Sequence, residues 1–218
     1  MDDNCYPACL AKLTPEEIDA MRRMYFSVHK MSEDVEGTLF IDKLPLNLLH
    51  AGIIKRMFPD AKFILALRHP CDTVLSFFMH ELALNRLTVQ SLDIEDSARL
   101  YDQSFSLWEQ YASVLDLDVH AIRYEDVVAN FRPTIEALLT YLGVEWTDAV
   151  LEFDKTAKAR GRIGTPSYHQ VTQKLYTRAS GRWQRYRTHL EPVLPILAPH
   201  AARYGYAMDV EEPVQKAD

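Results

Sequence analysis

This sequence of 218 residues has no excess of basic residues, since 24 Lys and Arg stand against 31 Asp and Glu and the formal net charge is −7. This balance argues against a protein that binds nucleic acid over a broad surface, because such surfaces need surplus cations to displace counterions from phosphates. Any anion site must be local. The basic residues cluster between Lys155 and Arg187, so a local site is possible in the C-terminal half.

Long apolar runs and a cysteine framework are also absent. The longest apolar stretches, such as residues 63–67, are far too short to cross a bilayer, and the opening Met-Asp-Asp-Asn does not resemble a secretory signal. Cys5, Cys9 and Cys71 are an odd number without metal-ligand spacing, which favours reduced thiols. We expect a cytoplasmic protein with no membrane segment and no metal.

What is present is an alternation of short apolar runs with segments of helical period. The runs at residues 38–42, 61–67 and 118–123 predict buried strands. Helices are predicted at residues 15–30, 46–57, 70–84, 95–115, 133–142 and 192–204, although Pro195 and Pro199 count against a regular last helix. Thr14 is placed to cap the first helix and Gly143 to end the fifth. The order predicts one α/β domain over residues 1–218, with a parallel sheet flanked by helices.

Residues 63–76 are the most informative stretch, because a buried strand ends in Arg68 and passes through Pro70 into a helix. Ligands of open parallel sheets bind at the carboxyl ends of strands, beside helix N-termini. Ser76 lies four residues beyond Asp72, so both share a helix face. A guanidinium and a hydroxyl that converge here predict a phosphate site. The alternative interpretation is a structural salt bridge between Arg68 and Asp72.

Several blocks in order resemble the sulfotransferases that use 3′-phosphoadenosine-5′-phosphosulfate (PAPS), most closely the bacterial tetratricopeptide-linked and the tyrosylprotein sulfotransferases. The blocks are DKLPLN (42–47), FPDAKF (58–63), RHPCDT with a serine (68–76), YED (124–126), TPSYHQV (165–171) and RASGRW with a tyrosine (178–186). The resemblance covers nearly the whole chain, and it implies a fold like that of the P-loop NTPases.

The resemblance also implies roles for single residues. Arg68 and Ser76 are expected to bind the 3′-phosphate of PAPS, and Tyr124 to lie near its adenine. Lys43 and Ser167 are expected to act at the transferring sulfuryl group. The expected nucleotide-binding loop near the C-terminus contributes Arg178, Gly181, Arg182 and Trp183. Each residue has a plain alternative: Lys43 as a solvated lysine, Tyr124 as a cap on the sheet edge, the arginines as a basic face, and Trp183 as core.

One family feature has no counterpart in the sequence. Members of the family open with a strand and a loop of the P-R-S-G-T-T type that binds the 5′-phosphosulfate. Gly37, the only glycine before the first expected strand, lacks that context, and no general base is assigned. We therefore expect an N-terminally incomplete sulfotransferase domain: a fragment, a wrongly assigned start, or a part of a split or larger protein. A further N-terminal segment or an oligomer partner would complete the sheet.

Three hypotheses about the function follow from these observations. The first is a PAPS-dependent sulfotransferase that acts on a hydroxyl acceptor, which is a peptide tyrosine, a saccharide or a small alcohol. The second is a non-catalytic module that keeps the 3′-phosphate site or an interaction surface. A P-loop kinase relative ranks last, because the sequence has no Walker lysine loop.

Overall fold

The computed structural model describes residues 7–28, 38–155 and 179–208. The chain divides into two compact units, of which the first comprises residues 1–63 and 104–118 and the second comprises residues 64–103 and 119–218. That the whole chain forms a single domain stays a prediction.

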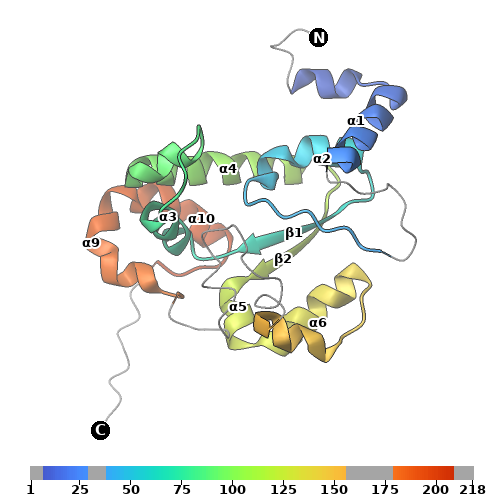
Figure 1. Ribbon diagram of the computed structural model, residues 1–218. Coiled ribbons are helices and arrows are strands. Elements are labelled where there is room, and N and C mark those ends of the chain that lie inside the picture. Colours follow the sequence, from blue (N-terminus) through green and yellow to red (C-terminus); the bar gives the residue numbers. More distant parts are fainter. Residues whose placement is uncertain (1–6, 29–37, 156–178, 209–218) are drawn as a thin grey trace. The chain divides into compact units, whose positions relative to one another are not determined.

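The described residues contain helices, short 3₁₀-helices (η) and two strands (Figure 1). In chain order the elements are η1 (Ala8–Lys12), α1 (Pro15–Val28), η2 (Asn47–His50), α2 (Ala51–Met57), β1 (Lys62–Leu67), α3 (Pro70–Met79), η3 (Thr88–Leu92), α4 (Ile94–Val114), β2 (Asp118–Arg123), α5 (Tyr124–Ala129), α6 (Phe131–Leu142), η4 (Asp148–Glu152), η5 (Arg182–Tyr186), α9 (Arg187–Leu190), η6 (Glu191–Val193) and α10 (Leu194–Arg203). The predicted helices and two of the three predicted strands are therefore confirmed, most of them with shifted ends.

The first unit begins with a helix that starts where its sequence predicts. The backbone N–H of Glu17 donates to Oγ1 of Thr14 at 3.3 Å, and the N–H of Thr14 donates to Oε2 of Glu17 at 2.8 Å. These two hydrogen bonds form a capping box, which satisfies backbone donors that the first helical turn leaves free. Thr14 thus caps α1, as predicted.

The prediction of a strand at residues 38–42 is wrong. The sheet of the described residues contains only β1 and β2, and residues 38–42 lie outside it without regular secondary structure. Leu39 and Ile41 are 50% and 61% exposed. A strand needs a neighbour that completes its ladder, and apolar composition alone does not supply one.

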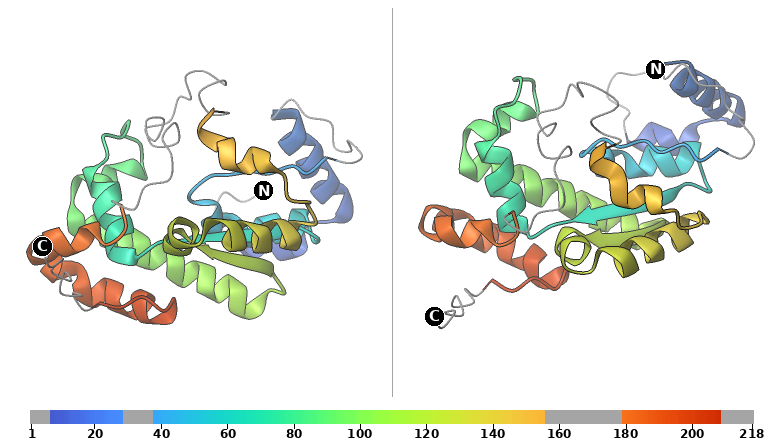
Figure 2. Two further views of the ribbon diagram at one scale, coloured as in Figure 1. Left: turned by 90° about the horizontal axis from the view of Figure 1, so that it is seen from below. Right: turned by 60° about the horizontal axis from the view of Figure 1, so that its bottom comes forward.

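The sheet itself consists of β1 and β2, which are hydrogen-bonded neighbours and run in the same direction (Figure 1). The chain passes from β1 to β2 through α3, η3 and α4, as parallel pairing requires. In the second unit α10 packs against α3, and α5 lies beside α6 (Figure 2). The buried apolar side chains of this unit include Leu67, Cys71, Val74, Leu75, Trp183, Leu190, Val193, Leu197, Ala201 and Tyr206.

In the second unit one helix ends earlier than predicted, and another forms as predicted in spite of its prolines. Helix α3 ends at Met79, before the predicted residue 84, and Phe78 and Met79 are more than two fifths exposed, so packing gives the last turn little support. Helix α10 continues through Pro199. Its face with Leu197 and Ala201 is fully buried, and we attribute the tolerance of the proline to this packing.

Candidate functional site

The candidate site lies at the carboxyl ends of the two parallel strands, within the second unit. Strand β1 ends at Leu67, and Arg68 and His69 connect it to the N-terminus of α3. Strand β2 ends at Arg123, and Tyr124 begins α5 at once. This is the edge of an open parallel sheet at which ligands bind.

The Arg68 guanidinium is held by a backbone carbonyl and an aromatic ring. Its Nη2 donates to the carbonyl oxygen of Ala179 at 2.6 Å, and its central carbon lies 5.5 Å from the centroid of the Tyr124 ring. Its Nε is buried, and no atom of the described residues accepts a hydrogen bond from it. A buried donor without an acceptor is costly, so this N–H is suited to a ligand oxygen.

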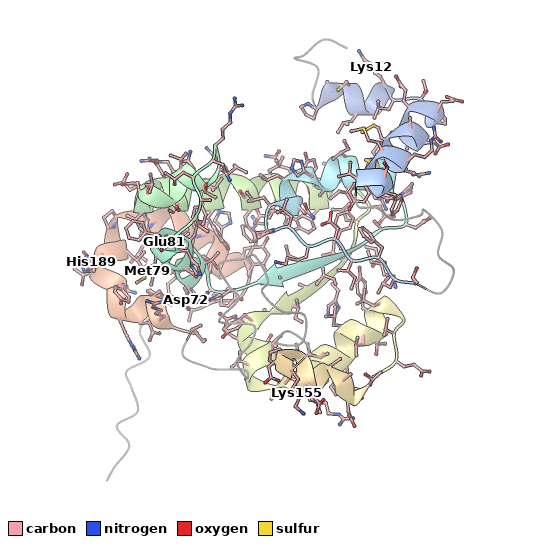
Figure 3. All side chains as sticks on the ribbon, in the orientation of Figure 1. Lys12, Asp72, Met79, Glu81, Lys155 and His189 are labelled. Atoms are coloured by element: carbon pink, nitrogen blue, oxygen red, sulfur yellow. The ribbon has the colours of Figure 1, made fainter. Side chains whose placement is uncertain are left out.

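Asp72 lies in the first turn of α3 (Figure 3), and its carboxylate is fully buried. Oδ2 accepts from the N–H of Gly181 and Oδ1 from the N–H of Trp183, both at 2.7 Å. Nη2 of Arg68 lies 4.0 Å from Oδ1. Burial raises the pKa of the Asp72 carboxyl, whereas the two N–H donors and Arg68 act in the opposite direction. Asp72 is therefore mainly a partner of the backbone at residues 179–183, and its ion pair with Arg68 is long.

The 179–183 loop takes its shape from a glycine and a tryptophan. Gly181 has φ of +69°, in the left-handed region that costs other L-residues energy, and it precedes η5. The Trp183 side chain is 1% exposed and stacks on His69 with ring centroids 4.8 Å apart. The guanidinium carbon of Arg187 lies 5.6 Å from the Trp183 ring. The loop is thus anchored in the core by its indole and to α3 by its N–H groups.

The remaining predicted site residues lie in several places. Ser76, one turn beyond Asp72 on α3, has its Oγ 3.4 Å from Nδ1 of His80. The guanidinium of Arg182 lies 5.8 Å from the Tyr186 ring. Lys43 is exposed and belongs to the first unit, and Ser167 and Arg178 lie outside the described residues. The structure thus brings together Arg68, Tyr124, Gly181 and Trp183, and the roles of all these residues stay predictions.

With this geometry in place, comparison with known proteins identifies the family. A sequence model of the sulfotransferase family matches residues 3–148, more than half of the chain. The chain belongs to the sulfotransferase family. The predicted family resemblance is confirmed.

Three relatives of this sulfotransferase family member share less than 30% of their aligned residues with it. An uncharacterized protein of Aquifex aeolicus (strain VF5) is 28% identical over 165 residues, which cover 75% of this chain and 21% of that protein. Protein-tyrosine sulfotransferase 1 of Danio rerio is 23% identical over 90% of this chain and 56% of its own length. Protein-tyrosine sulfotransferase 2 of Gallus gallus is 21% identical over 90% of this chain and 54% of its own length. The chain thus spans about half the length of the two named sulfotransferases.

A solved structure shows the same fold. The sulfotransferase domain from the curacin biosynthetic pathway aligns with a TM-score of 0.63 and 18% identity, covering 92% of this chain and 77% of that domain. The predicted fold class, α/β with a parallel sheet of the P-loop NTPase type, is confirmed.

Sequence reasoning missed a second set of contacts in this sulfotransferase fold. Glu125 accepts from the backbone N–H of His69 through Oε1 and from the Tyr206 hydroxyl through Oε2, both at 3.0 Å. Burial raises the pKa of Tyr206. Glu125 therefore ties the start of α3 to the segment after α10. The YED block contained Glu125, but its partners are 56 and 81 residues away in sequence, so no local pattern predicts them.

The described residues include no group of three or more His, Cys, Asp or Glu side chains that could hold a metal ion. No helix in residues 7–28, 38–155 or 179–208 has the length and apolar character needed to span a membrane.

Proposed function

We propose that this protein transfers a sulfuryl group from PAPS to a hydroxyl acceptor. Family membership supports the reaction class. The observation that carries the choice of donor is the Arg68 guanidinium, whose buried Nε has no acceptor among the described residues although it lies at the ligand-binding edge of the sheet. A phosphate oxygen would satisfy this N–H and form a charge-assisted hydrogen bond. Arg68 thereby fits the 3′-phosphate of PAPS.

The other expected residues would extend this contact over the nucleotide. We propose that Ser76 supplies a hydroxyl to the same phosphate, that Tyr124 lies near the adenine, and that the loop with Gly181, Arg182 and Trp183 covers the nucleotide. Arg178 is expected at the start of that loop. In the described residues Arg68, Tyr124 and the loop are already neighbours, which supports this arrangement.

The chemistry requires fixed positive charge. The bond from sulfur to the bridging phosphate oxygen breaks, a bond from sulfur to the acceptor oxygen forms, and the acceptor proton passes to a base. Negative charge develops mostly on the leaving phosphate oxygen, as in loose phosphoryl transfer, and cations and N–H donors stabilise it. We propose Lys43 and Ser167 for this task and assign no residue as the base.

Peptide tyrosine is the acceptor to test first, because two of the relatives are named protein-tyrosine sulfotransferases. A saccharide and a small alcohol remain the other acceptor classes. We also propose that the protein works in the cytoplasm, in keeping with three cysteines whose number and spacing do not suggest a disulfide framework.

Calorimetry and a transfer assay test the proposal. The purified chain is titrated with 3′-phosphoadenosine-5′-phosphate, the product nucleotide, and with adenosine 5′-phosphate, which lacks the 3′-phosphate. Tighter binding of the first nucleotide is expected. Equal binding of both, or binding of neither at millimolar concentration, would contradict the donor assignment. Transfer is measured with PAPS that carries radiolabelled sulfate, against a tyrosine peptide, a saccharide and a small alcohol.

A non-catalytic module that keeps the 3′-phosphate site is the second candidate function. It is favoured by the arrangement around Arg68, which offers contacts for a phosphate and an aromatic ring but to which no general base is assigned. We expect weak nucleotide binding and little or no transfer from this chain alone. Rapid transfer by the isolated chain would exclude this candidate, whereas selective nucleotide binding without transfer would support it.

A further inference from the structure

Asp72 is unusual because its carboxyl side chain is fully buried. Its relative exposure is 1%, and in the described part of the chain every other Asp and Glu is more exposed. A buried carboxylate is tolerated only where donors compensate for the lost water. Here the compensation comes from the backbone of a loop more than 100 residues away in sequence.

Two side chains at or just before the N-terminus of α3 bind three backbone groups of the 179–183 loop. Asp72 accepts from the N–H groups of Gly181 and Trp183, and Arg68 donates to the carbonyl of Ala179. Arg68 and Asp72 are four residues apart and face each other at 4.0 Å. The same pair of residues therefore orients the loop and the guanidinium together.

Both carboxylate oxygens of Asp72 already accept short N–H hydrogen bonds. An oxygen that is buried and committed in this way is poorly placed to remove a proton from an acceptor hydroxyl. This argues against a catalytic base and in favour of a structural influence on the neighbouring groups. The stacking of Trp183 on His69 adds a second anchor for the loop.

We propose that Asp72 is a positioning residue that holds the 179–183 loop and the Arg68 guanidinium in their binding arrangement before a 3′-phosphorylated nucleotide arrives. A loop ordered in advance need not lose its conformational entropy on binding, so the nucleotide binds more tightly. The nucleotide part of this inference rests on the proposed function, whereas the ordering of the loop does not.

Hydrogen exchange of the free protein tests the ordering directly. In Asp72→Asn the amide keeps one acceptor oxygen but presents an NH₂ group to the other backbone N–H. Peptides that cover residues 179–187 are expected to exchange about tenfold faster or more, as the loss of a charged hydrogen bond implies. The control is Asp102→Asn, which removes a carboxylate that lies 2.8 Å from Nε2 of His200 elsewhere in the second unit. Equal exchange of these peptides in the two variants would overturn the proposal.

Binding selectivity supplies a readout that simple destabilisation would not change. The ratio of affinities for 3′-phosphoadenosine-5′-phosphate and adenosine 5′-phosphate is expected to fall about tenfold in Asp72→Asn and to remain at the wild-type value in Asp102→Asn. An unchanged ratio in Asp72→Asn would overturn the positioning role. If the wild-type protein binds neither nucleotide, the proposed function fails, and the exchange experiment still decides whether Asp72 orders the loop.

A measurement on the wild-type protein covers the case in which Asp72→Asn does not fold. The amide protons of Gly181 and Trp183, followed by NMR, are expected to exchange at least about tenfold more slowly than they would in an unstructured peptide. Exchange at the unstructured rate would show that Asp72 does not hold the loop and would overturn the proposal.

Discussion

Replacement of Arg68 tests the proposed phosphate contact most directly. Arg68→Met removes the charge and all donors but retains an unbranched apolar side chain beside Tyr124. Arg68→Lys keeps the charge but loses the planar fork and the Nε donor. The wild-type Nε is buried without an acceptor among the described residues, while Nη2 is occupied by Ala179. A phosphate contact made through Nε should therefore be lost in both variants.

The magnitude follows from the type of hydrogen bond. Hydrogen bonds to charged groups contribute about 1.5–3 kcal/mol, and about 1.4 kcal/mol corresponds to a tenfold change in affinity. Arg68→Met is expected to weaken binding of 3′-phosphoadenosine-5′-phosphate by about 10- to 100-fold. Arg68→Lys should retain part of the Coulomb attraction and weaken binding by about tenfold. Affinity for adenosine 5′-phosphate should change much less, because it lacks the phosphate that Arg68 would contact.

Isothermal titration calorimetry measures both nucleotides with each variant. The control is Arg132→Met, which removes an exposed arginine that pairs with Glu136 at 2.8 Å and lies 4.8 Å from the Trp146 ring. This control should bind both nucleotides as the wild type does. If Arg68→Met binds the bisphosphate as tightly as Arg132→Met does, Arg68 does not contact the 3′-phosphate and the argument from its buried donor is refuted.

Three further predictions concern the fold. Leu197→Ala, at a fully buried position of α10, should lower the free energy of unfolding by about 2–5 kcal/mol in urea titrations, and a loss below about 1 kcal/mol would contradict the packing of α10 in the core. Burial raises the pKa of the Cys71 thiol to about 12. Iodoacetamide at pH 8 should therefore leave Cys71 unmodified in the folded protein and alkylate it in denaturant, as mass spectrometry would show. Rapid alkylation of the native protein would contradict the burial of Cys71. Thr14→Ala should lower stability by about 0.5–2 kcal/mol and speed hydrogen exchange in α1, because the capping box is lost; unchanged exchange there would show that the box contributes nothing.

Local signals predicted many of the elements well. The run DVHAIR predicted a strand at residues 118–123, and β2 has these bounds. Gly143 was predicted to end a helix, and it follows α6 with φ of +74°. Thr14 was predicted to cap α1 and does so. These features depend on residues within one or two turns of each other, so they can be predicted from the local sequence alone.

The wrong predictions concern features that depend on distant partners. Residues 38–42 have the composition of a buried strand, yet they lie outside the sheet of the described residues. Helix α3 ends at Met79 because its exposed end gains little from packing. The helix predicted at residues 192–204 does form as α10, although Pro199 counted against it, and its buried face explains why. In each case packing, which a local pattern does not encode, decided the outcome.

The sequence by itself determined the family resemblance, the strand that leads into Arg68, and the glycine of the later loop, because these are patterns of residue type and spacing. Only the tertiary structure decided how Asp72 is used. A carboxylate four residues after an arginine predicts a helical salt bridge. The fold instead brings the N–H nitrogens of Gly181 and Trp183 to 2.7 Å from the carboxylate oxygens of Asp72. The physical reason is that a buried carboxylate pairs with the donors that the packed chain places beside it, and those donors lie 109 and 111 residues away.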